Sequence, residues 1–352
     1  METSAQKTEP VGVIGAGSFG TAVSNLLAIN TQVFLYSRRV EVAEAINQER
    51  FRYGVTVHEN VEATSDLQEV TTKCQLLFIF VPSDAFRSVM KQLSPLLNPS
   101  HIIVHGTKGL DVTELAGVDV RKLKTVSRDQ VHVMSSVIKE ESSVVRVGIM
   151  SGPNLARELL DGQPTATLIA SKFDEVIDRA KAVLQSHQLF VFGSYDLLGA
   201  ELAGVLKNVI ALGSGMLKGF GLGKNIQAML ITRGLHEMIF LGQHFGSSAS
   251  AFLGTAGIGD LIATATSKKS RNFLFGFRLG SGESLEEVLA TNAELAEGVR
   301  TLAFVNGLAN SQKLRLPICQ ILYRIVYENM DMEEAMNYLM NYRYDKDVSF
   351  SI

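Results

Sequence analysis

The sequence predicts an α/β fold in which a doubly wound, mostly parallel sheet is followed by an all-helical carboxyl-terminal domain. Short apolar segments with strand character alternate with helical segments through the first half of the chain. A glycine-rich turn follows the first of these strands, and mostly helical segments follow Ser194. At 352 residues the chain is too long for one small core. We therefore expect two domains, over residues 1–193 and 194–352.

Composition and charge indicate an ordinary globular protein, with 46% hydrophobic and 20% charged residues. The net charge is -3 and no long basic run occurs, so the electrostatic signature of a nucleic-acid-binding protein is missing. Cys74 and Cys319 lack metal-ligand spacing, which favours reduced thiols and no metal site. The segment Met1 to Pro10 lacks the apolar core of a secretory signal. No uninterrupted apolar run approaches the ~20 residues of a membrane span, so we expect a cytoplasmic protein.

The first strand, Val11 to Ile14, runs directly into Gly15, Gly17 and Gly20, and a helical pattern continues to about Asn30. In this setting the first glycine permits a tight turn and the second lets a pyrophosphate approach the backbone. The third lets helix and strand pack closely. Free amides at the start of the helix then face the anion. The motif predicts a Rossmann-like dinucleotide-binding domain over residues 1–193, with Ser18 and Phe19 inside the loop.

The second strand, Thr31 to Tyr36, ends in Ser37, Arg38 and Arg39, where an NAD-selective site usually has an acidic residue for the ribose hydroxyls. A guanidinium there can pair with a 2'-phosphate. We therefore expect NADPH to be accepted, with a preference for NADPH over NADH left open and NAD as the alternative cofactor. Both arginines could instead be solvated loop residues.

Further strands are expected at Leu76 to Val81, His101 to His105 and Arg146 to Met150, and then at Ala166 to Ala170 and Leu189 to Phe192. Ligands bind at the carboxyl ends of strands in such sheets. Two of these ends carry candidate residues: Lys108 could bind an anionic substrate, and Gly152 could offer its amide at close range. Either segment could also be a simple turn.

The segment Leu197 to Leu217 is apolar or small on nearly every face, so it predicts a buried helix, yet it contains Lys207. No carboxylate lies three or four positions from this lysine, so its partner must come from elsewhere. Burial disfavours a charged amine, which is how a lysine becomes able to exchange protons near neutral pH. Lys207 could instead extend its amine to the edge of the helix.

A second glycine-rich turn, Gly254 to Gly259, leads into Asp260, and Ser270, Arg271 and Asn272 follow it. Arginine beside asparagine combines a planar charged fork with neutral donors, which suits a phosphate. The alternative is that Asp260 caps a helix and the basic residues form a solvated loop. Arg233 and Glu237, four positions apart, most simply form a pair on a helix surface or between domains.

Together these residues resemble those of the soluble bacterial NAD(P)-dependent glycerol-3-phosphate dehydrogenases. The resemblance runs from about Val11 to beyond Glu297. Seven blocks occur in the family's order: Gly15 to Gly20, Thr107-Lys108-Gly109, Ser151-Gly152-Pro153, Lys207-Asn208-Val209, Leu230 to Gly234, Gly257 to Leu261, and Ser270-Arg271-Asn272.

The resemblance implies a reversible hydride transfer between NAD(P)H and dihydroxyacetone phosphate, which gives sn-glycerol 3-phosphate for phospholipid synthesis. It makes Lys207 the acid/base residue and Asp260 its counter-charge. The substrate positions it implies are Lys108, Gly152, Asn154, Lys207, Asp260, Ser270, Arg271 and Asn272. The cofactor positions are Ser18, Phe19, Arg38, Arg39, Lys108, Ala156, Arg271, Leu295 and Glu297, beside the three loop glycines. The helical domain, residues 194–352, would bind the substrate and could bury the face of a homodimer.

Two departures from the family stand next to a predicted substrate residue. Asn154 replaces the usual Thr or Ser, and Leu155 replaces the usual Phe. Asn154 retains both a donor and an acceptor, so substrate binding is expected to survive. The segment Ser135 to Val145 has no counterpart and no physical explanation. Two other functions stay open: a related reductase acting on another hydroxy acid or sugar phosphate, and a non-catalytic dinucleotide sensor.

Overall fold

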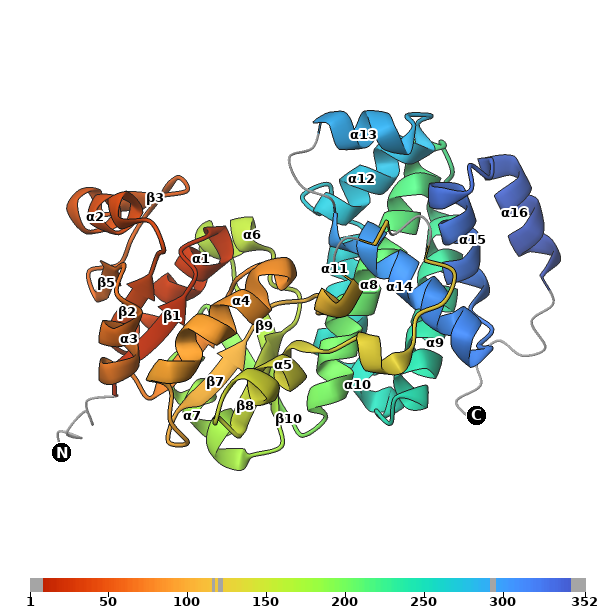
Figure 1. The fold of residues 1–352 in the computed structure, drawn as a ribbon. Coiled ribbons are helices and arrows are strands. Elements are labelled where there is room, and N and C mark those ends of the chain that lie inside the picture. The colour runs from red at the N-terminus through yellow and green to blue at the C-terminus, as the bar shows by residue number, and fades with distance from the viewer. Residues whose placement is uncertain (1–8, 116–117, 120–122, 292–295, 343–352) are drawn as a thin grey trace. The chain divides into compact units, whose positions relative to one another are not determined.

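The computed structural model describes residues 9–115, 118–119, 123–291 and 296–342 (Figure 1). The chain forms two compact units, Met1–Asp111 with Val133–Leu197, and Val112–His132 with Leu198–Ile352. The segment Val112–His132 is therefore part of the second unit, although it precedes residue 193. Backbone hydrogen bonding explains this, because Val126 N–H donates to the carbonyl of Gly307 at 3.0 Å.

The first unit is built on one eight-stranded sheet in the order β10-β9-β8-β7-β6-β1-β2-β5. Every neighbouring pair is parallel except β8 and β9. The doubly wound, mostly parallel sheet is thus confirmed, and β5 is a strand that the sequence pattern did not reveal. The strands are β1 Val11–Ile14, β2 Val33–Tyr36, β5 Val61–Thr64, β6 Leu76–Ile79, β7 Ile102–His105, β8 Arg146–Ser151, β9 Thr165–Ser171 and β10 Leu189–Ser194. A separate antiparallel hairpin joins β3 Phe51–Arg52 to β4 Val55–Thr56.

Helices cover both faces of this sheet, and each face has its own apolar core. Val11 and Val13 of β1 belong to one core, and Ile14 belongs to the other, because successive strand residues point to opposite faces. Helices α1 Ser18–Leu27, α2 Val40–Glu49 and α7 Asp174–Leu184 pack on the first face; α3 Leu67–Lys73, α4 Ser83–Leu93 and α5 Met134–Glu141 pack on the second. The short helix α6 Ala156–Leu160 follows β8.

The second unit is helical, as the sequence predicts, and α8 lies in its core. Of the described helices, α8 is the one long and apolar enough to cross a membrane, and 94% of its most apolar stretch is buried. Burial of this kind is what a core helix requires. The helices are α8 Leu197–Gly219, α9 Lys224–His244, α10 Ala249–Leu253, α11 Asp260–Ala265, α12 Arg271–Gly280, α13 Leu285–Thr291, α14 Glu297–Gln312, α15 Pro317–Tyr327 and α16 Met332–Asn341.

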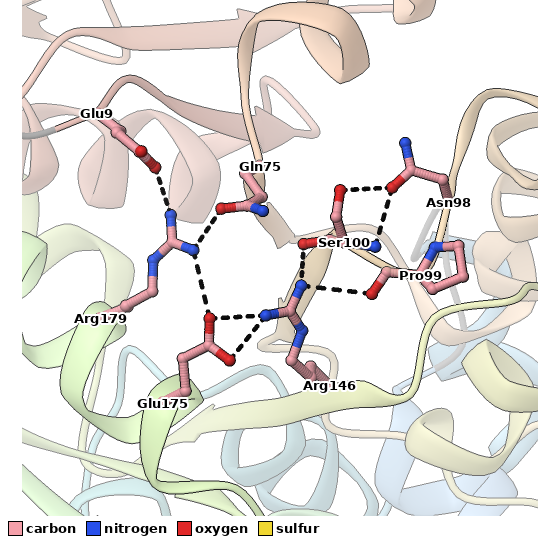
Figure 2. A network of polar contacts seen from close by, with 8 residues as sticks. All are labelled: Glu9, Gln75, Asn98, Pro99, Ser100, Arg146, Glu175 and Arg179. Carbon is pink, nitrogen blue, oxygen red and sulfur yellow. Dashed lines mark hydrogen bonds and ion pairs between the residues drawn. The ribbon is translucent and has the colours of Figure 1, made fainter.

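A network of ion pairs ties together the amino-terminal ends of several strands in the first unit (Figure 2). Arg146, the first residue of β8, holds both carboxylate oxygens of Glu175 on α7, at 2.6 and 2.7 Å. Arg179 bridges Glu175 at 3.6 Å and Glu9 at 2.6 Å. Arg146 also donates to the carbonyl of Ser100, just before β7. Because these contacts lie at the starts of the strands, they stabilise the sheet away from its ligand-binding edge.

Glu237 is buried in the second unit, so the expectation of a surface or interdomain pair with Arg233 is wrong for this carboxylate. Its oxygens accept backbone N–H groups of Ile318 at 2.5 Å and Cys319 at 3.0 Å. These amides open helix α15, where the positive end of the helix dipole favours a carboxylate. Burial nevertheless dominates and raises the pKa of Glu237 to about 7, while the two backbone hydrogen bonds lower it.

We predict that Glu237 makes folding stability depend on pH. Its folded pKa of about 7 lies above the ordinary value of 4.5, so the folded chain binds this proton more tightly than the unfolded chain does. Its contribution is full below pH 4.5 and is lost as the pH rises to about 7. By linkage the loss amounts to about 3 kcal/mol.

Urea unfolding at about pH 5 and about pH 8 measures this effect. The unaltered chain should lose more stability between the two conditions than Glu237→Gln, which cannot ionise. Glu333→Gln, at an exposed position of α16, is the control and should follow the unaltered chain. Parallel pH profiles for the chain and Glu237→Gln would contradict the prediction.

Candidate active site

The glycine loop between β1 and α1 has a backbone path that side chains would block. Gly15 has a φ of 117°, and a Cβ there would lie 2.4 Å from the Phe80 carbonyl oxygen. A Cβ on Gly20 would lie 1.8 Å from the Gly15 carbonyl oxygen, which places α1 directly against the turn. At Gly17 a Cβ would meet nothing within 4 Å, so this side of the loop is open. The amino end of α1 therefore has room for a ligand.

Arg38 and Arg39 follow β2 at the same edge of the sheet as the glycine loop. The register of β1 and β2 pairs Ile14 with Tyr36, so the residues after each strand are neighbours. Both arginine side chains are exposed. The contact of Arg39 with Glu41 is long, at 3.9 Å between Nε and Oε1, and both side chains are solvated. Such an exposed pair contributes little, so the guanidinium can exchange it for an anion.

Arg52 lies against the glycine loop, a contact that no sequence pattern indicated. Its Nε donates to the carbonyl of Ala16 at 3.2 Å, and its guanidinium lies 4.7 Å from the centre of the Tyr53 ring. Tyr53 has a φ of 52°, an unusual value for an aromatic residue. The Tyr53-Gly54 turn is the one local signal of this hairpin, whose strands are two residues each.

Lys108, Gly152 and Asn154 come together at the ends of β7 and β8, which are parallel neighbours. Lys108 Nζ donates to the Gly152 carbonyl at 2.8 Å, and Asn154 N–H donates to the same oxygen at 2.7 Å. The Asn154 side-chain amide donates to Thr167 Oγ1 at 2.8 Å. Ala156 begins α6 two residues later. Lys108, Gly152 and Asn154 therefore form one polar cluster. The structure adds Thr167 to it.

Lys207 and Asp260, 53 residues apart in the chain, meet inside the second unit. Lys207 Nζ lies 2.6 Å from Asp260 Oδ1 and 2.6 Å from Thr264 Oγ1. The side chains of the ion pair are only 7% and 2% exposed. Asp260 is the first residue of α11 and directly follows the π-helical turn Thr255–Gly259. Thr264 was not predicted from the sequence. Its position four residues after Asp260, on the same helix face, could have predicted it beside the carboxylate.

Backbone contact between α8 and α12 sets the register of the two helices. A Cβ on Gly276 would lie 1.9 Å from the Leu212 carbonyl oxygen, and a Cβ on Gly280 would lie 2.0 Å from that of Met216. Moving back by one helical turn on each helix leads to Asn208 and Asn272, whose side-chain amides share a 3.0 Å hydrogen bond. The amino end of α12 is therefore held beside the turn of α8 that carries Lys207.

The start of α12 presents Ser270, Arg271 and Asn272 in three different environments. Ser270 caps the helix, since its Oγ accepts the N–H of Phe273 at 3.3 Å. Arg271 is exposed. Asn272 is buried, and its Oδ1 accepts the N–H of Gly298 at 2.8 Å, which brings the first turn of α14 alongside.

Two predicted cofactor residues belong to the segment before and at the start of α14. Glu297 is the first residue of α14 and is half-buried. Leu295 lies outside the described residues. Within the part of the chain that the structure describes, no group of three or more His, Cys, Asp or Glu side chains is placed to hold a metal ion.

A mostly parallel sheet with a glycine turn between β1 and α1, followed by a helical unit holding a buried lysine, defines a two-domain nicotinamide-dinucleotide-dependent dehydrogenase. The family model described as NAD-dependent glycerol-3-phosphate dehydrogenase N-terminus matches residues 10–177, and the one for the C-terminus matches residues 196–337. The chain belongs to this family.

Similar proteins extend this result over nearly the whole chain. Glycerol-3-phosphate dehydrogenase (NAD(P)+) of Pseudomonas fluorescens is 39% identical, over 97% of this chain and 96% of its own length. The protein of that name from Azotobacter vinelandii is also 39% identical, over 97% of each chain. The crystal structure of glycerol-3-phosphate dehydrogenase from Coxiella burnetii aligns with a TM-score of 0.83 at 30% identity, over 95% of this chain and 99% of that one.

Proposed function

We propose that the chain is a glycerol-3-phosphate dehydrogenase that reversibly reduces dihydroxyacetone phosphate to sn-glycerol 3-phosphate with NAD(P)H. The observation that carries this proposal is the buried ion pair of Lys207 with Asp260 in a member of this family. The product would supply phospholipid synthesis. A cytoplasmic location and a homodimer belong to the same proposal. So does the assignment of residues 1–193 as the dinucleotide-binding domain and of residues 194–352 as the substrate-binding and catalytic domain.

The glycine loop supports the binding of a dinucleotide. The open side at Gly17 and the amino end of α1 suit a pyrophosphate, and the exposed Arg38 and Arg39 suit a 2'-phosphate. When bound, NAD(P)H supplies the hydride. The residues proposed to hold it are Gly15, Gly17, Ser18, Phe19, Gly20, Arg38, Arg39, Lys108, Ala156, Arg271, Leu295 and Glu297.

Lys207 is proposed to move the proton at the substrate's C2 oxygen. In reduction its ammonium polarises the carbonyl and donates a proton to that oxygen; in oxidation its amine accepts the proton of the C2 hydroxyl. Asp260 and Thr264 fix Nζ in position through their 2.6 Å contacts. Since the pair is buried, competing water is kept away from the amine.

The substrate's phosphate is proposed to bind at the start of α12. The exposed guanidinium of Arg271 and the amino end of a ten-residue helix both favour an anion. This region also distinguishes a phosphate ester from an unphosphorylated hydroxy compound, which a different reductase of similar fold would accept. Lys108, Gly152, Asn154, Ser270 and Asn272 complete the proposed substrate positions.

Initial rates test the proposed function directly. NADPH absorbance should fall when dihydroxyacetone phosphate is added, and paired assays with NADH measure the cofactor preference. In the oxidative direction, glycerol should react on the order of 10²-fold or more slowly than glycerol 3-phosphate, because the phosphate contacts are lost. Unchanged absorbance would reject the dehydrogenase, similar rates with glycerol would reject the phosphate site, and a strong NADH preference would count against the role of Arg38 and Arg39.

We predict that Lys207→Ala lowers kcat by roughly 10²-fold or more, because general acid/base help is lost. The exposed Lys218, on the same helix, provides the control Lys218→Ala, which should keep normal turnover. Because the change also leaves Asp260 buried without its partner, NADPH binding by the variant should be measured as a check on folding. A variant that binds NADPH and turns over normally would remove Lys207 from the mechanism.

We predict that Arg271→Ala mainly raises the KM for dihydroxyacetone phosphate, by roughly 10- to 100-fold, as expected for one charge-assisted hydrogen bond. Lys268→Ala removes the same charge from the exposed loop three residues earlier and is the matched control. Equal increases in the two variants would indicate long-range electrostatics instead of direct contact. If the KM for NADPH alone increased, Arg271 would belong to the cofactor site only.

A further inference from the structure

We propose that Thr167 is a positioning residue that fixes which end of the Asn154 amide faces the substrate. In this arrangement Asn154 Oδ1 accepts a hydrogen bond from the substrate's terminal hydroxyl, on the carbon at the unphosphorylated end. The inference rests on the proposed function, since it takes Asn154 as a substrate residue.

The hydrogen bonds of Thr167 leave one orientation for the amide. Thr167 is fully buried on β9, and its Oγ1 donates to the carbonyl of Ser151 at 3.2 Å. A hydroxyl has one hydrogen, so the same oxygen can only accept from Asn154. The Nδ2 group of Asn154 therefore faces Thr167, at 2.8 Å. Oδ1, at the other end of the planar amide, must then face away from Thr167.

Asn154 Oδ1 has no hydrogen-bond partner within the described residues. Asn154 is only 9% exposed, and its Oδ1 and the Oγ of Ser151 are buried without a hydrogen bond there. An unsatisfied acceptor in a buried place is unfavourable, so a donor is expected from a ligand. Dihydroxyacetone phosphate and glycerol 3-phosphate both carry a hydroxyl donor at the unphosphorylated end. A fixed acceptor selects for that hydroxyl.

The loop itself is held by other contacts, so Thr167 acts on the amide and not on the loop. Lys108 and the Asn154 backbone hold the Gly152 carbonyl, and Thr165 Oγ1 donates to the Pro153 carbonyl at 3.2 Å. Asn154 replaces the Thr or Ser that is usual in the family, and this replacement explains why the amide needs Thr167 as a partner. A Thr or Ser hydroxyl can rotate to donate or accept, whereas the two ends of an amide differ and must be oriented.

Thr167→Val tests the proposal, because valine has the same shape and lacks the hydroxyl. We expect the KM for dihydroxyacetone phosphate to rise roughly 5- to 20-fold, the range of one hydrogen bond in a site. The KM for NADPH should stay unchanged. Thr167→Ser restores the hydroxyl and should recover most of the loss. Thr165→Val removes a similar bond to the same loop without touching Asn154, so it is the matched control and should resemble the unaltered enzyme.

A substrate analogue with a methyl group in place of the terminal CH2OH isolates the hydroxyl contact. The unaltered enzyme should prefer dihydroxyacetone phosphate over this analogue in kcat/KM, and Thr167→Val should reduce that preference by the same factor by which it raises KM. A purely structural role would lower kcat/KM for both compounds equally and leave the preference intact, which would overturn the proposal.

Asn154→Ala separates failure of this inference from failure of the proposed substrate site. If Asn154→Ala raises the KM for dihydroxyacetone phosphate while Thr167→Val leaves it within about twofold, the positioning role of Thr167 is overturned and the proposed function stands. If Asn154→Ala also leaves that KM unchanged, Asn154 is not a substrate residue and both assignments fall.

Discussion

Burying one ammonium group constrains how the helical unit is built. An isolated charge inside α8 would cost several kcal/mol, so Lys207 requires a carboxylate at hydrogen-bond distance. Asp260 meets this requirement from the first residue of α11, at 2.6 Å. The π-helical turn Thr255–Gly259 leads directly into it, and a Cβ on Gly257 would lie 2.0 Å from the Phe252 carbonyl oxygen. Close packing of this turn against the end of α10 therefore helps to set the position of Asp260.

Direct contact between helix backbones then positions α12 and α14 relative to α8, the helix that carries Lys207. At the glycines of α8 and α12 the two backbones touch, so the separation of the helices cannot adjust as it would across flexible side chains. Asn208, next to Lys207, is bonded to Asn272, and Asn272 holds the N–H of Gly298. The beginnings of α12 and α14 are thus placed by the helix that carries the lysine. Arg271, the first residue of α12, is therefore held near the turn of α8 that carries Lys207.

The sequence predicts features set by the residues of one segment, and it misses features set by which distant segments come into contact. Strands buried on both faces, such as β1 and β6, give continuous apolar runs, whereas β5 alternates and the β3–β4 hairpin is two residues deep. The spacing along the chain shows that Lys207 has no carboxylate three or four positions away. Only the resemblance to the dehydrogenase family identified Asp260 as its partner. Glu237 was misread because the amides that it caps belong to α15, 81 residues later in the chain.

The one antiparallel pair of the sheet explains why Thr167 can reach Asn154. In the β8–β9 register Ser151 is opposite Leu168, so the end of β8 lies beside the first half of β9. In a parallel pair, carboxyl ends would lie together, and the end of β8 would face the end of β9. Reversing β9 instead supplies side chains of its amino-terminal half, Thr165 and Thr167, to the loop that follows β8. A reversed strand beside a binding edge therefore gives that edge a second set of residues, and these can orient the residues in contact with a ligand.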